Sequence, residues 1–185
     1  MSLQIYKPNK TNSGFAFSFY IAKDKKTSLP ILFLNAIAQH SWDDKKRIGS
    51  FSGNKDNPDK NASIKFNEFE VGSIISAIEN RFEWNTYHSF EENKTQIKLA
   101  PWDKPVKINK IDPQTKQPVE TSQIIPAFGL SMTRNGSQTF RIALEPGEAE
   151  ALKHLCKFLL FRKNEIMFDE LSQKSYKPQT EDHPF

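Results

Sequence analysis

Positively charged and aromatic side chains alternate with apolar ones in several short segments of this sequence. Lys98, for example, stands between Ile97 and Leu99, and Arg141 stands between two further apolar residues. Alternation with a period of two is typical of β-strands that turn one face to a core, so these cations are expected on the opposite, outer face. There a cation can pair with a phosphate group, and a ring can stack on an unpaired base.

Nine residues combine a suitable side chain with an outward position on a predicted strand or beside a turn. They are Tyr20, Arg47, Phe51, Lys65, Tyr87, Lys98, Trp102, Arg134 and Arg141. Each one alone is also explained by a solvated charge or by packing at a sheet edge. Their interleaving on several strands favours a binding surface, although a one-residue slip of register would exchange the two faces.

Other kinds of chemistry find little support. The four histidines, His40, His88, His154 and His183, have no partner at metal-ligand spacing. The single cysteine, Cys156, lies in an apolar helical pattern and reads as a core residue. The sequence contains neither a nucleophile elbow nor a glycine-rich phosphate loop. We therefore expect no catalytic residue, no metal and no cofactor.

The composition is that of a folded chain with a mild positive charge. Of its 185 residues 37% are hydrophobic, and the formal net charge of +4 permits an anionic partner. One cysteine allows no internal disulfide, and no run reaches the roughly 18 apolar residues that a membrane span needs. These features predict a cytosolic protein without a membrane segment.

The first half of the chain predicts four strands and a helix. Residues 1–13 are polar and are expected to be flexible. The strands are predicted over 14–22, 30–38, 47–52 and 62–66. The period then changes to that of a helix, which Asn67 or Glu68 caps and whose apolar face carries Val71, Ile74 and Ile78.

The second half predicts the same order of elements. Its strands are expected over 84–90, 95–102, 127–134 and 138–144, and a helix begins near Pro146. The dipeptide Asn135-Gly136 marks a hairpin between the last two strands. The polar, proline-containing stretch 103–124 is expected to be a mobile insertion.

The two halves align when one is shifted by 78 residues, which places Phe66 on Leu144, Glu70 on Glu148 and Ile74 on Leu152. We interpret the chain as a tandem repeat, with repeat 1 over 14–82 and repeat 2 over 84–163. The expected fold class is α+β: four antiparallel strands plus a helix, given twice, with two curved sheets packed and the helices at their base. The binding domain would span 14–171, followed by a flexible tail over 172–185.

This order of elements, together with three short stretches of sequence, resembles the Whirly and positive-cofactor-four superfamily of single-stranded-DNA-binding proteins. The stretches are Phe66–Ile78 at the strand-to-helix junction, Tyr87–Phe90, and Thr95–Trp102. The resemblance covers about residues 14–163 and departs from the plant Whirly signature, since Leu32–Ala36 replaces a Lys-Gly-Lys-Ala stretch. It implies a non-enzymatic protein whose sheet edges hold single strands.

The last six residues, Thr180 to Phe185, are similar to the acidic Pro-Phe tip of bacterial single-strand-binding proteins. That similarity implies a partner site for replication or repair proteins. In it, Glu181 and Asp182 steer the approach, while Pro184 and Phe185 enter a basic pocket. A frayed terminus is the alternative interpretation.

Together with these resemblances, the sequence predicts a largely sequence-independent single-stranded-DNA-binding protein that acts in replication, recombination or repair. We expect it in the cytoplasm of a bacterium or of a phage-infected host. Two alternatives stay open: a transcription coactivator or other protein-interaction module, and an RNA-binding or RNA-annealing protein of the same fold. A nuclease is a third and less favoured alternative. Assembly into homo-oligomers is left open as well.

Overall fold

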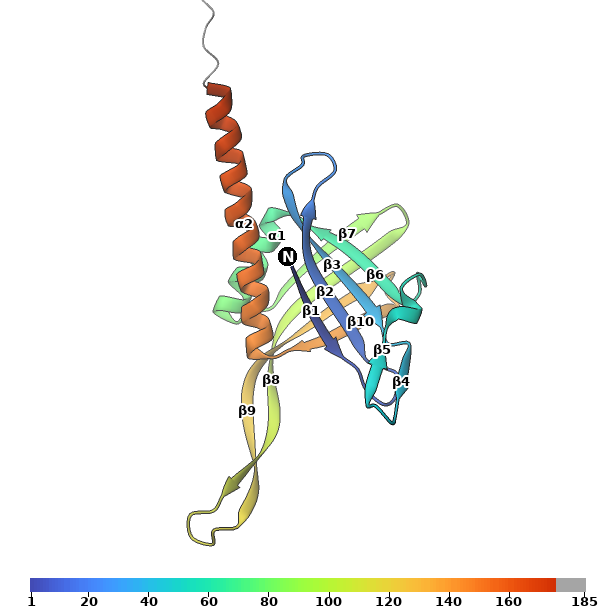
Figure 1. Cartoon of the computed structure of the whole chain (residues 1–185), viewed down its shortest axis with the longest axis vertical. Coiled ribbons are helices and arrows are strands. Elements are labelled where there is room, and N and C mark those ends of the chain that lie inside the picture. The colour runs from blue at the N-terminus through green and yellow to red at the C-terminus, as the bar shows by residue number, and fades with distance from the viewer. Residues whose placement is uncertain (176–185) are drawn as a thin grey trace, which may run out of the picture.

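The structure, a computed structural model, describes residues 1–175 and contains two four-stranded antiparallel sheets, each followed by a helix (Figure 1). The first sheet has the order β1-β2-β3-β6, from β1 (Ser2–Lys7), β2 (Phe15–Lys23), β3 (Pro30–Ala38) and β6 (Asn61–Phe66), and α1 (Glu68–Asn80) follows it. The second has the order β10-β9-β8-β7, from β7 (Trp84–Phe90), β8 (Asn93–Ile111), β9 (Pro118–Arg134) and β10 (Gln138–Leu144), and α2 (Pro146–Ser175) follows it.

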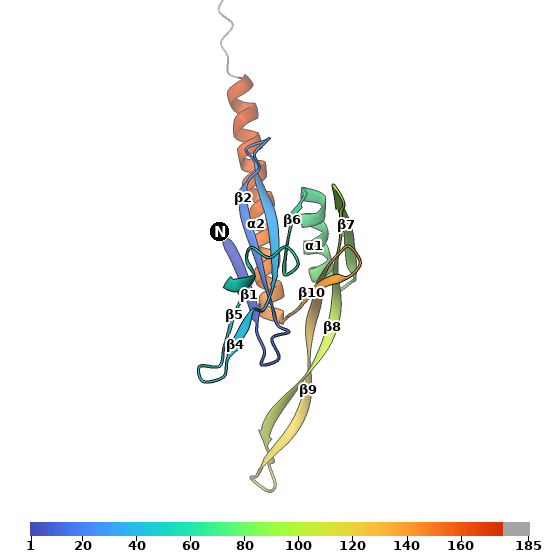
Figure 2. The same cartoon turned by 90° about the vertical axis from the view of Figure 1, so that its right-hand side faces the viewer.

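The two sheets form separate layers (Figure 2), and both helices lie along one side of them (Figure 1). The core consists of the inner face of each sheet and of the helix faces that cover them. Its largest side chains with less than 2% exposure are Phe17, Phe19, Leu32, Leu34, Phe66, Val71, Ile97, Leu99, Met132, Phe140, Leu144 and Leu152. The predicted α+β class, with its antiparallel sheets and two helices, is confirmed.

The start of α1 is determined locally. The Asn67 side chain accepts a hydrogen bond from the Glu70 backbone N–H at 3.0 Å, and the Glu70 carboxylate accepts one from the Asn67 N–H at 2.9 Å. This reciprocal capping box satisfies two N–H groups that a helix start leaves unpaired, and such a cap stabilises a helix by about 1 kcal/mol. The helix ends at Arg81, which takes the left-handed conformation with φ of 51°.

The predicted repeat is visible in the packing. Residues that the 78-residue shift equates are buried in both halves, as in the pairs Phe66 and Leu144, and Ile74 and Leu152. The helices also contact each other directly through an ion pair between Lys157 of α2 and Glu79 of α1, with the two atoms 2.5 Å apart. Lys157 holds the pKa of Glu79 below its usual value by this hydrogen bond.

The N-terminal segment corrects a prediction. Residues 1–13 were expected to be flexible throughout, but Ser2–Lys7 form β1, an edge strand that pairs with β2. Ile5, which is opposite Phe17, is 3% exposed and belongs to the core. Six residues with two apolar side chains carry too short an alternation to predict a strand without knowledge of the partner strand.

The structure also differs from the strand that was predicted over 47–52. The chain there forms a separate hairpin of β4 (Ser41–Asp43) and β5 (Ile48–Ser50), followed by the short helix η1 (Ser52–Asn54). β3 pairs directly with β6, because β1 already supplies the fourth strand of the sheet. Asn54 anchors this excursion, since its buried amide donates to the backbone oxygens of Ala38 and Gln39.

Two further predicted boundaries differ from those in the structure. The stretch 103–124 was expected to be an unfolded insertion, but its residues 103–111 and 118–124 continue β8 and β9 into a long two-stranded hairpin that projects from the sheets (Figure 1). Helix α2 runs to Ser175, so residues 172–175 of the predicted tail are helical. Within the described residues, no helix has both the length and the apolar character that crossing a membrane demands.

Candidate nucleic-acid interface

Four of the nine predicted residues share the outer face of the second sheet. Lys98, Ser131 and Arg141 are register partners on β8, β9 and β10 and so form one row across the sheet. Tyr87 of β7 pairs with Gln96, two residues before Lys98, and Trp102 lies four residues after Lys98 on β8. We call Tyr87, Lys98, Trp102 and Arg141 the second outer face.

The spacing on this face suits an extended chain of phosphates and bases. Neighbouring strands are about 4.8 Å apart, so the Lys98 and Arg141 backbones, two strands apart, are about 10 Å from each other. Trp102 is about 13 Å further along β8 than Lys98. The Tyr87 side chain is 70% exposed and that of Trp102 43%, so both rings are open to a stacking partner.

The two cations of this face differ in their partners. Lys98 pairs with the Glu83 carboxylate at 2.8 Å, and both side chains are about half exposed. Such a surface pair is worth at most about 1 kcal/mol, so a phosphate can replace the carboxylate. Arg141 is exposed and, among residues 1–175, its side chain has no hydrogen-bond or ion-pair partner.

Tyr20 and Lys65 lie on the outer face of the first sheet, in the row Tyr20, Phe33 and Lys65. The Tyr20 ring stacks on the Phe33 ring, with centroids 5.2 Å apart and planes 11° from parallel. Lys65 pairs with Asp24 at 2.7 Å, and this bond, with two backbone N–H groups, holds the pKa of Asp24 far below its usual value. Stacking within the protein therefore already occupies one face of the Tyr20 ring.

Phe51 joins the same side of the molecule through Tyr6 of β1. The two ring centroids are 5.7 Å apart, and the rings border a hollow of about 440 Å³ over β1, β2, β3 and β6 that Lys55 also lines. Tyr6 is 51% exposed. The sequence did not indicate Tyr6, because residues 1–13 were interpreted as flexible. We call Tyr6, Tyr20, Phe51 and Lys65 the first outer face.

The remaining two predicted residues lie off these faces. Arg47 is exposed in the tight turn between β4 and β5, with φ of 53°. Arg134 is at the predicted place, beside the β9–β10 turn, but its register partners are Thr95 and Gln138, on the inner side of the sheet. Its side chain donates to Asn93 at 2.9 Å and approaches the Pro58 carbonyl oxygen at 3.4 Å, so it links the second sheet to the loop before β6.

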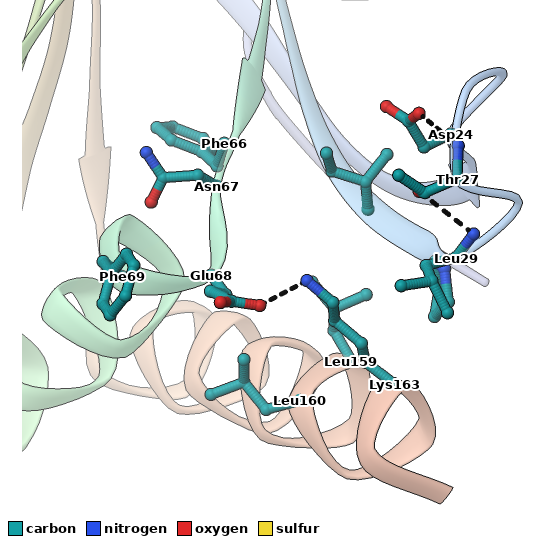
Figure 3. Close-up of a pocket in the computed structure, with 12 residues that line it drawn as sticks. Asp24, Thr27, Leu29, Phe66, Asn67, Glu68, Phe69, Leu159, Leu160 and Lys163 are labelled. Atoms are coloured by element: carbon teal, nitrogen blue, oxygen red, sulfur yellow. Dashed lines mark hydrogen bonds and ion pairs between the residues drawn. The ribbon is translucent and has the colours of Figure 1, made fainter. Parts of the chain in front are cut away.

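A hollow beside the helices is lined by none of the nine predicted residues (Figure 3). Its lining does include Asp24, the ion-pair partner of Lys65. It has a volume of about 280 Å³ and lies between the β2–β3 loop, the start of α1 and the middle of α2. Leu29, Phe69 and Leu160 give it an apolar lining, and an ion pair between Glu68 and Lys163 crosses it. Its chemistry favours packing rather than recognition of an anion.

The predicted partner site, Glu181, Asp182, Pro184 and Phe185, lies outside the described residues. One exposed ring near the second outer face was missed: Phe90, at the end of β7, is 73% exposed. Its alternation places it with Trp84 and His88 on the inner side of β7. An inner position normally means burial, so the sequence pattern argued against an accessible ring there.

Comparison with solved structures decides which fold this is. The chain is similar to WHY1 from Arabidopsis thaliana, with a TM-score of 0.54 and 13% identity over 100% of this chain and 97% of that chain. It has the Whirly fold. It is also similar to the plant transcriptional regulator PBF-2, with a TM-score of 0.51 and 13% identity over 97% of this chain and 89% of that chain. No model of a known protein family matches the sequence, and no curated protein matches it.

The Whirly fold confirms the architecture that the sequence resemblance implied. At 13% identity the likeness concerns the fold, so the roles of individual residues rest on the geometry of this chain. On each of the two outer faces, aromatic rings and cations lie together.

Proposed function

We propose that this chain binds single-stranded DNA on the outer faces of its sheets, largely without regard to base sequence. The observation that carries the proposal is the second outer face, where Tyr87, Lys98, Trp102 and Arg141 converge from β7, β8 and β10. Cations along a phosphate path and exposed rings beside it are the two components that a sequence-tolerant single-strand site requires.

The division of labour follows from the side chains. Lys98 and Arg141 neutralise phosphates and release counterions, which makes binding depend on salt. Tyr87 and Trp102 stack on bases, and every base has a face for stacking, so these contacts favour no sequence. The bases of duplex DNA are stacked on one another and expose no face on which these rings can stack. The second outer face is therefore expected to prefer single strands.

The biological setting we propose is DNA replication, recombination or repair, where single strands occur. In this proposal the tip with Pro184 and Phe185 recruits partner enzymes. Its support is the sequence similarity described above. A synthetic peptide of residues 176–185 offered to purified replication proteins tests it independently of DNA binding.

We also propose that the protein associates with itself through the outer half of α2. Phe161, Phe168 and Leu171 of this helix are 61%, 70% and 65% exposed. Spacings of seven and three residues place these side chains on one side of the helix, and exposed apolar side chains that gather in one patch mark interaction sites. Analytical ultracentrifugation of the protein and of a Phe161→Ser/Phe168→Ser variant tests this, since a smaller species is expected for the variant.

Fluorescence anisotropy tests the main proposal. A labelled oligothymidylate of about 30 nucleotides is titrated at about 50 mM and about 200 mM salt, with duplex DNA and RNA of equal length as competitors. Binding that weakens with salt and resists duplex competition is the expected result. Absence of binding at the lower salt would contradict it and favour the protein-interaction alternative, whereas stronger competition by RNA would favour the RNA-binding one.

A further inference from the structure

A groove separates the two sheets where their edge strands approach each other. It has a volume of about 450 Å³ and lies between β6 of the first sheet and the β7–β8 hairpin of the second. Ser63, Lys65, Ser89, Phe90, Thr95 and Arg134 are among the residues that line it. This volume falls in the range of about 300–1,000 Å³ that is usual for small-molecule sites.

The inner face of the second sheet changes from apolar to polar at this groove. One row across its four strands is apolar at three positions, with Phe140, Met132 and Ile97 in register. The next row towards the groove contains Gln138, Arg134, Thr95 and His88, all polar. The space between the sheets is therefore a packed core near the helices and a polar groove beyond it.

One hydroxyl group in the groove is open to a ligand. Gln39, Asn54, Glu70 and Thr95 are the buried polar residues of the described chain, and the first three all form side-chain hydrogen bonds. Thr95 is 7% exposed, and among residues 1–175 its hydroxyl has no hydrogen-bond partner but keeps accessible surface at the groove that it lines. A hydroxyl that opens into a groove and bonds to no other protein group is free to donate to a ligand or accept from one.

The groove also has a ring and cations at its mouth. The Phe90 side chain is 73% exposed and makes no contact with another ring among the described residues. Lys65 and Arg134 line the groove from opposite sheets. Lys65 also belongs to the first outer face, and Phe90 lies on the same strand as Tyr87 of the second. A strand that crosses from one outer face to the other passes this mouth.

We propose that the groove receives one nucleobase of the bound single strand and reads its edge. The inference rests on the proposed function and adds a base-selective subsite to it. The base stacks on Phe90, the Thr95 hydroxyl bonds to a polar atom of the base edge, and Lys65 and Arg134 neutralise the flanking phosphates. Stacking tolerates every base, but a hydrogen bond to the base edge does not, so the groove confers a modest base preference.

Photocrosslinking locates the base directly. The full chain is mixed with oligothymidylate that carries a single 5-iodo-2′-deoxyuridine, irradiated, digested and sequenced by mass spectrometry. Crosslinks to Phe90 or His88, on the inner side of β7, are the expected result. Crosslinks confined to Tyr87 and Trp102 would overturn the inference while leaving strand binding on the second outer face intact.

Matched substitutions give a second test by anisotropy. Phe90→Ala is expected to weaken binding about tenfold, whereas Phe69→Ala, which removes a similarly exposed ring from α1, leaves it unchanged. Thr95→Val is expected to change the ratio of affinities for oligothymidylate and oligodeoxyadenylate about three- to tenfold, with Thr121→Val on the projecting hairpin as control.

The two failures can be told apart. A wild-type protein that binds no single strand contradicts the proposed function itself. A wild-type protein that binds, together with Phe90→Ala and Thr95→Val variants that match it in affinity and base ratio, contradicts only the groove. Equal thermal unfolding midpoints of the variants and their controls show that each comparison is made between folded proteins.

Discussion

Glu70 and Glu148 hold equivalent positions in the two halves, each as the third residue of its helix, and each bonds to the first strand of the opposite sheet. Glu70 accepts from Thr86 at 2.6 Å and from His88 at 2.8 Å, both on β7, while Glu148 accepts from Lys7 of β1 at 2.6 Å. Each carboxylate also accepts a backbone N–H at the start of its own helix. The two halves are therefore joined reciprocally.

This relationship predicts unequal losses of stability. Glu70→Ala leaves three hydrogen-bond donors without their acceptor at a buried position and is expected to lower the free energy of unfolding by about 2–4 kcal/mol. Glu148→Ala removes a more exposed group with two donors and should cost about 1–2 kcal/mol. Urea denaturation measures both, and equal effects would argue against the role assigned to burial.

The rings of the second outer face should dominate affinity. Tyr87→Ala and Trp102→Ala are each expected to weaken binding of oligothymidylate by about 1–3 kcal/mol, because each loses a base-stacking contact. Phe69→Ala serves as the control, since Phe69 lies on α1 and is 80% exposed. Unchanged affinity in both ring variants, measured by anisotropy, would remove the second outer face from the interface.

The cations of the same face should determine the response to salt. Lys98→Ala and Arg141→Ala are each expected to reduce the slope of log affinity against log salt by about 0.7, and the double variant by about 1.4. Lys153→Ala on α2 provides a lysine control, because Lys153 pairs with Glu150 away from both outer faces. A slope that stays constant across all variants would mean that neither cation contacts a phosphate.

The single cysteine should be unreactive in the folded chain. Burial raises the pKa of the Cys156 thiol to about 12 from 9.0. Thiol titration at pH 8 is expected to detect it only after denaturation. Because the folded state keeps its proton to higher pH than the unfolded one, this group makes stability fall as the pH rises from about 9 to about 12. Cys156→Ala should lessen that fall, as urea denaturation over this pH range would show.

The projecting hairpin should be dispensable for both folding and the proposed binding. No residue between 103 and 124 belongs to the core cluster or to either outer face. Replacement of residues 105–124 by an Asn-Gly turn is therefore expected to retain cooperative unfolding and affinity for single strands. A large loss of affinity with the fold intact would reveal a contribution of the hairpin that the outer faces do not explain.

Local patterns in the sequence determined most of the elements of this protein. Period-two alternation over 15–22 and 138–144 and helical spacing from Val71 onward depend on neighbouring residues alone, so strands, helices and the repeat were predictable. The sides of Tyr87, Lys98 and Arg141 followed too, because a strand with one face in the core can place them in only one way.

The tertiary structure decided what depends on partners distant in the chain. It brought Ser2–Lys7 to the edge of β2, turned Arg134 towards Asn93 and Pro58, and opened the groove in which Thr95 lacks a partner. An edge strand acquires its identity only from the strand beside it, and a groove exists only where two sheets diverge. The sequence alone determined which side chains alternate, and the packing of the sheets decided which of them a ligand can reach.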